Sequence, residues 1–136
     1  MEIKFNDDMN IESRIGYRDT TKLDKKLVDI LLSVGISANL QGYHYLKESI
    51  KLVMENPYYI GSITKVMYPT VANRFDTTAT RVERAIRHAL EVAYSKGKIT
   101  NLNRIFGLNI FDKNEKPTNS EFVALVADRL SYDIQK

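Results

Sequence analysis

The chain has 136 residues, of which 43% are hydrophobic and 27% are charged, as is ordinary for one soluble globular domain with its own core. It has no cysteine and only two histidines, His44 and His88, which excludes disulfides, cysteine nucleophiles and thiolate metal sites; we expect no metal site and no cofactor. No apolar run approaches the length of about 18 residues that a membrane span needs, so we expect no contact with a membrane. The absence of cysteine leaves the cytosol as the default, and we expect a cytoplasmic location associated with the nucleoid.

The positive charge is concentrated in the middle of the chain. Residues 61–106 carry eight Lys and Arg against three Asp and Glu, a net charge of +5, whereas residues 1–60 and 107–136 each have a net charge of −1. A localised basic segment on a near-neutral domain favours a partner of high negative charge, above all nucleic acid. The same surplus also fits an ordinary solvated helix face, and charge alone does not separate the two interpretations.

The N-terminal segment differs from the rest of the chain. Residues 1–18 show no steady hydrophobic period, and we interpret them as a linker or flexible arm. Apolar residues then recur at three-to-four spacing through residues 19–136, which predicts an all-α domain. Its first helix ends at Gly35, and its second runs from Gly42 to the Asn56-Pro57 pair, because a residue before proline is disfavoured in a helix.

Further helices follow in the second half of the domain. Ser62 is predicted to cap a short helix, and Pro69 fits the first turn of the next, where its missing N–H costs nothing. A long helix is predicted from Ala79 to Lys96, followed by a short, mixed segment over residues 98–117 that covers the core. The Thr118–Glu121 capping box begins the last helix.

The two helices on either side of Asp76-Thr77-Thr78 have the spacing of a helix-turn-helix. Such a motif needs a small residue where its helices cross, and Ala72 is suited to that place. Phe75, Val82 and Ala85 follow it by three, ten and thirteen residues, which suits the apolar side chains that close the corner. The turn often contains glycine, but aspartate also adopts left-handed backbone conformations. Plain helical bundles can show the same spacing.

The predicted helix-turn-helix spans about residues 69–96. Its second helix carries arginines on its outer side. At 100° per residue its apolar residues gather on one face, so that Arg81, Arg84 and Arg87 project outward from its N-terminal half. A recognition helix presents that half to base edges, where arginine can donate two bonds to guanine and glutamate can accept one from cytosine. The alternative is a solvated face with Glu83–Arg87 and Arg87–Glu91 pairs.

Polar residues around the motif suit the DNA backbone. Thr77 and Thr78 stand beside the free N–H groups at the start of the long helix, where anions bind. The full set of phosphate candidates is Ser62, Lys65, Arg74, Thr77, Thr78 and Thr80.

Three stretches, Gly61–Val66, Thr80–Ala89 and Lys116–Phe122, strongly resemble the effector domain of the stage zero sporulation protein A family. The resemblance covers about Leu23 to Leu130. It implies a six-helix domain that binds promoter boxes like TGTCGAA and activates or represses sporulation genes. It also implies an intact two-component response regulator with an N-terminal receiver domain, where any metal would bind. We therefore expect this chain to be the effector half with part of the linker.

The resemblance also assigns roles to individual residues. It implies that Arg81, Glu83 and Arg84 contact bases, with Arg87 and His88 just beyond them. It implies that the stretch from Lys98 to Phe106 contacts the housekeeping sigma factor of RNA polymerase, and the candidates there are Lys98, Asn101, Asn103 and Phe106. The last helix, from Thr118, matches a segment linked to contact between neighbouring copies on tandem boxes of double-stranded DNA.

Two alternatives to DNA binding are an enzyme and a protein-interaction domain. An enzyme is not expected, because the chain has no glycine-rich phosphate loop, no nucleophile with a nearby histidine and no supported carboxylate pair, and we identify no catalytic residue. The remaining alternative is a helical protein-interaction domain that uses the helix-turn-helix as a scaffold. The outward arginines argue against that as the main role.

Overall fold

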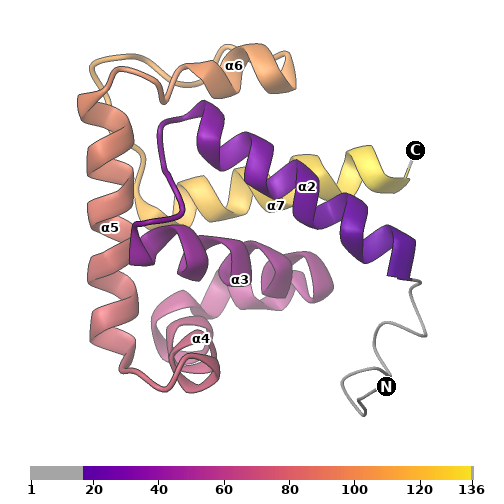
Figure 1. Ribbon diagram of the computed structural model, residues 1–136, viewed down its shortest axis with the longest axis vertical. Helices are drawn as coiled ribbons and strands as arrows, with labels where there is room; N and C mark the ends of the chain where they lie inside the picture. The colour runs from indigo at the N-terminus through magenta and orange to yellow at the C-terminus, as the bar shows by residue number, and fades with distance from the viewer. Residues whose placement is uncertain (1–16, 136) are drawn as a thin grey trace.

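The computed structural model describes residues 17–135, and within them the chain forms six α-helices, two short helical segments and no β-strand (Figure 1). The elements in chain order are α2 (Tyr17–Ser33), α3 (Gln41–Glu55), the 3₁₀ segment η1 (Pro57–Ser62), the π-helical segment η2 (Ile63–Met67), α4 (Tyr68–Arg74), α5 (Ala79–Ser95), α6 (Asn101–Phe106) and α7 (Asn119–Gln135). The expected all-α, six-helix fold is confirmed. None of the helices in the described range is long and apolar enough to cross a membrane.

The predicted arm lies almost wholly outside the described residues. Only Tyr17 and Arg18 of the predicted arm, residues 1–18, are described, and both belong to α2. The described part of α2 therefore begins within the predicted arm, because hydrophobic periodicity locates helix ends only to within a residue or two.

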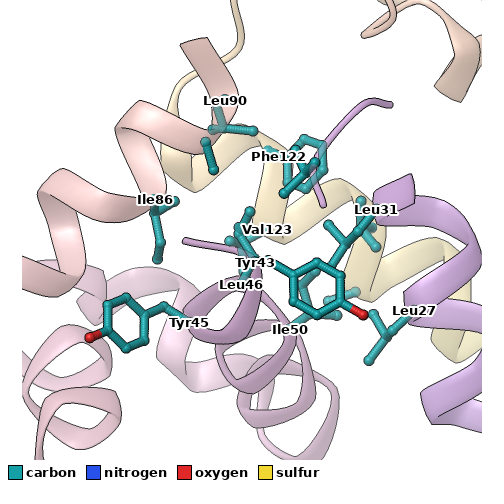
Figure 2. Packing of buried hydrophobic residues seen from close by; sticks show 14 of the residues in the cluster. Leu27, Leu31, Tyr43, Tyr45, Leu46, Ile50, Ile86, Leu90, Phe122 and Val123 are labelled. Carbon is teal, nitrogen blue, oxygen red and sulfur yellow. The ribbon is translucent and has the colours of Figure 1, made fainter. Parts of the chain in front are cut away.

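Four helices share one core. Figure 2 shows their buried side chains meeting between α2, α3, α5 and α7; those that are fully buried include Leu27, Leu31, Leu46, Ile50, Ile86, Leu90, Phe122 and Val123. In Figure 1, α5 stands along one edge of the molecule, with the first turns of α3 and α7 against its inner side and α4 near its beginning. One face of α5 is thus committed to the core, and its opposite face is left on the outside.

Gly42, at the start of α3, brings this helix directly against α5. A Cβ atom added to Gly42 would lie 2.2 Å from the backbone oxygen of Ala85 and 2.7 Å from the Cβ atom of Ala89. Real Cβ atoms do not approach so near, so only glycine fits there without moving a backbone. Ala72, the small residue predicted for the crossing inside the helix-turn-helix, is also buried.

The predicted cap at Ser62 is wrong. Ser62 ends η1 and makes no side-chain capping bond to η2, because its backbone (φ −140°, ψ 43°) is not in the extended conformation from which an N-cap side chain reaches the N–H groups of the next turn. The side-chain cap lies six residues earlier, where the side-chain oxygen of Asn56 accepts a hydrogen bond from the N–H of Tyr58 at 3.0 Å. Pro57 follows Asn56 in the first turn of η1, a position that needs no N–H.

The predicted capping box at the start of α7 is confirmed. The N–H of Thr118 donates to Glu121 Oε1 at 2.9 Å, and the N–H of Glu121 donates to Thr118 Oγ1 at 3.1 Å. These reciprocal bonds satisfy two backbone donors and fix the direction in which the chain enters α7.

Candidate nucleic-acid interface

Helices α4 and α5 and the four residues between them form the predicted helix-turn-helix. Asp76 has a positive φ of 54°, the left-handed conformation expected of an aspartate in this turn. The N–H of Thr77 donates to the carbonyl of Ala72 at 2.9 Å, which closes the turn. Thr78 then caps α5, since its side-chain oxygen accepts from the N–H of Arg81 at 3.2 Å. The turn and the cap together fix where α5 begins and the direction in which it leaves α4.

The spacing of Phe75 predicted that its side chain closes the corner between the two helices from inside, and this prediction is wrong. Its side chain is 41% exposed, and its ring packs edge-on against Tyr45 of α3, with centroids 5.1 Å apart. The left-handed turn begins directly after Phe75, so this residue lies at the rim of the corner. Val82, predicted for the same corner, is fully buried, and Ala85 is half-buried.

The outer face of α5 carries three unpaired basic or ionisable side chains. Arg81, Arg84 and His88 are all exposed, and within residues 17–135 none of their side chains makes a hydrogen bond or an ion pair. At 100° per residue, Arg84 lies about 160° around the helix from the buried Val82 and Ile86. These side chains are therefore presented outward with their donors free.

Two other predicted base-contacting residues bind each other. Arg87 and Glu83 form an ion pair at 3.2 Å, and both are partly exposed. An exposed pair one turn apart on a helix contributes only about 0.3–0.5 kcal/mol, so a stronger partner can open it at little cost. Glu91, one turn further along, pairs with Lys116 instead of Arg87, also at 3.2 Å.

The phosphate candidates lie in different surroundings. Lys65 and Thr80 are exposed, whereas Ser62 and Thr77 are half-buried. Arg74 forms an ion pair with Glu48 of α3. The sequence pattern did not reveal this partner, because the two residues lie on different helices and are 26 positions apart in the chain. Thr78 uses its oxygen as the cap of α5, which leaves its hydroxyl hydrogen available to donate.

The four sigma-factor candidates are not all on the surface. Lys98 is exposed, but Phe106 is only 7% exposed and belongs to the core. The amide of Asn101 donates to the carbonyl of Ser33 at 2.7 Å, which ties α6 to the end of α2. Asn103 accepts from the N–H groups of Ile110 and Phe111 at 3.0 Å each and donates to the carbonyl of Phe111 at 2.8 Å.

These contacts make Asn101 and Asn103 parts of the fold. The side chains that α6 does expose are Arg104 and Ile105, the latter 39% exposed. The helical period of Leu102 and Phe106, four residues apart on the buried side, was the signal that places Arg104 outward, with Asn103 and Ile105 on its two flanks.

Asn119, at the start of α7, is a further residue near α5 that sequence reasoning missed. Its amide nitrogen donates to Tyr68 Oη at 3.0 Å and to the carbonyl oxygen of Glu83 at 3.2 Å. No local pattern marks this contact, because its partners precede it by 51 and 36 residues. Burial raises the pKa of Tyr68 above its usual value, so its phenol stays protonated at neutral pH.

The arrangement is suited to binding an anionic polymer. Guanidinium groups project from an outer helix face, and hydroxyls and free N–H groups surround the N-terminus of that helix. Across the described range, no group of three or more His, Asp or Glu side chains is placed to hold a metal ion.

Comparison with known families gives a match over most of the chain. The family model described as "Sporulation initiation factor Spo0A C terminal" matches residues 27–130. The match includes the whole helix-turn-helix, the outer face of α5, all of α6 and most of α7.

Proposed function

This chain belongs to the family of C-terminal DNA-binding domains of the sporulation initiation factor Spo0A, and we propose that it binds promoter boxes resembling TGTCGAA by inserting α5 into the major groove. Arg81, Glu83 and Arg84 contact base edges in this proposal, with Arg87 and His88 at the next turn.

One observation carries the proposal: exposed side chains with free donors lie on the face of α5 opposite the core. Arg81 and Arg84 have no protein partner in the described part of the chain. A helix that served only as scaffold would gain nothing from leaving these guanidinium groups unpaired on one face, whereas guanine offers each of them two acceptors.

The surrounding residues supply contacts to the DNA backbone. Lys65 and Thr80 are exposed, and Thr78 retains a hydroxyl hydrogen to donate to a phosphate oxygen. Arg74 would have to exchange Glu48 for a phosphate, and because that pair is partly exposed, the exchange costs little. Such contacts fix the register of the domain on the duplex, and the base contacts supply specificity.

A binding titration at several salt concentrations tests the proposal. We expect the domain to bind a duplex with a TGTCGAA box more tightly than a scrambled duplex of the same composition, and both affinities to fall steeply as salt rises, because bound cationic side chains release counterions from DNA. No affinity for either duplex would instead support the protein-interaction alternative.

We also propose that the stretch from Lys98 to Phe106 contacts the housekeeping sigma factor of RNA polymerase. Exposed Lys98, Arg104 and Ile105 support this, and Asn103 and Phe106 would act by holding the segment in shape. Lys98→Ala and Ile105→Ala should reduce activated transcription in a purified system while leaving the affinity for the box unchanged. Full activity of both variants would contradict this contact.

A further inference from the structure

Helix α5 is contacted by other helices on both flanks of its outer face. Ala85 and Glu83 lie on either side of Arg84, each about 100° around the helix from it. On the Ala85 side, Gly42 brings the backbone of α3 directly against α5. On the Glu83 side, the side chain of Asn119 donates to the backbone oxygen of Glu83 at 3.2 Å.

The contact on the Glu83 side of α5 also reaches α4. Asn119 also donates to Tyr68 Oη at 3.0 Å, and Tyr68 is itself buried at the first position of α4. The carbonyl of Glu83 only accepts hydrogen bonds, so the Asn119 atom facing it is the amide nitrogen. The capping box of Thr118 fixes the backbone that carries Asn119. One amide therefore joins both helices of the helix-turn-helix to α7.

Orientation of α5 matters more for bases than for phosphates. A rotation of about 10° moves side-chain atoms at the 5–6 Å radius of a helix by about 1 Å. A paired set of hydrogen bonds to one base edge does not survive such a shift, whereas a flexible cation still reaches a phosphate.

We propose that Asn119 is a positioning residue that fixes the rotation of α5 about its own axis, and so sets the sequence specificity of the domain without touching DNA. This inference rests on the proposed function. It gives the start of α7 a role in base recognition.

The test measures a specificity ratio, the affinity for a TGTCGAA duplex divided by that for a scrambled duplex at one salt concentration. Asn119→Ala should lower this ratio about tenfold, the equivalent of one net hydrogen bond, while affinity for the scrambled duplex and its salt dependence stay as in wild type. Ser120→Ala is the matched control, since the side chain of Ser120 is exposed and makes no hydrogen bond among residues 17–135; it should leave the ratio unchanged.

A second variant separates positioning from general stability. Tyr68→Phe keeps the buried ring and removes only the hydroxyl that accepts from Asn119, so we expect a smaller fall in the ratio from a protein that is still folded. Combined with Asn119→Ala it should add nothing, because Tyr68 acts through Asn119. If Asn119→Ala proves unfolded, the ratio of Tyr68→Phe decides the question.

The outcomes are distinguishable. A wild-type ratio of one contradicts the proposed function, and this inference falls with it. A wild-type ratio well above one that folded Asn119→Ala leaves unchanged, or an equal loss of affinity for both duplexes, overturns the role of Asn119 alone.

Discussion

At the scale of single residues, neighbours along α5 serve separate purposes. Val82 and Ile86 are fully buried, Glu83 and Arg87 pair with each other, and Arg84 projects outward with no partner in the described structure. Because these residues alternate around one helix, a substitution on the outer face should change binding without changing the fold.

Arg84→Ala is the direct test of that separation. It should weaken binding to the TGTCGAA duplex by about 1–3 kcal/mol, the usual contribution of a good base contact, with no change in melting temperature. Arg104→Ala on α6 is the control for losing one exposed arginine. Wild-type affinity of Arg84→Ala for both cognate and scrambled duplexes would remove Arg84 from the base contacts.

The cap of α5 gives a second prediction at this scale. Thr78→Ala removes the oxygen that accepts from the N–H of Arg81, and should lower the free energy of unfolding by about 0.5–2 kcal/mol. Thr78→Ser keeps an oxygen in that place and should cost less. Chemical denaturation of both variants measures the difference; equal losses would show that the hydroxyl oxygen is not what stabilises the helix start.

At the scale of elements, the relation between α3 and α5 determines where the outer face of α5 points. The oxygen of Ala85 would lie 2.2 Å from a Cβ atom at Gly42, and neither backbone can yield without moving its helix. The crossing of these two helices is therefore specified by the absence of one side chain.

Gly42→Ala should consequently destabilise the domain by about 1–3 kcal/mol, the usual cost of overpacking. Gly61→Ala is the matched control, because a Cβ atom at Gly61 would meet nothing within 4 Å. The denaturation midpoints of the two variants should differ clearly. A stable Gly42→Ala protein would mean that α3 and α5 can separate without loss.

Hydrophobic period and capping signals predicted most of these elements, because both are local properties of the chain. They placed α3, α5 and the start of α7 within a residue or two. They failed where the outcome depends on backbone geometry or on tertiary packing. Ser62 lacks its predicted cap because its backbone is not in the extended capping conformation, and Phe75 lies at the rim of the corner and not inside it.

The candidate site shows the same division. The outward direction of Arg81 and Arg84 follows from helical geometry, which needs only the sequence of α5. Arg74 pairs with Glu48, and Asn119 contacts Tyr68 and Glu83, across long distances in the chain. No short stretch of sequence includes both partners, so these contacts could not be predicted.

At the scale of the whole molecule, charge and core are arranged around α5. The segment of net charge +5, residues 61–106, contains η2, α4, α5 and α6, while the core draws on helices from both ends of the domain. The apolar stripes of these helices are used in that one core, so we expect the domain to be a monomer in solution.

On DNA with two adjacent boxes, we expect two copies to bind cooperatively, with α7 near their contact. Binding to one duplex raises the local concentration of the two copies, so a weak contact suffices. A titration of one-box and two-box duplexes at fixed salt measures this. Equal affinity per box would contradict the contact between copies and leave recognition of a single box intact.

The central claim is that α5 enters the groove of a specific box, and backbone NMR of the domain during titration with a one-box TGTCGAA duplex tests it most directly. We predict that the largest changes in amide chemical shift fall on residues 77–88, with small changes through α2. The largest changes on α2 or α6, with α5 unaffected, would contradict the account.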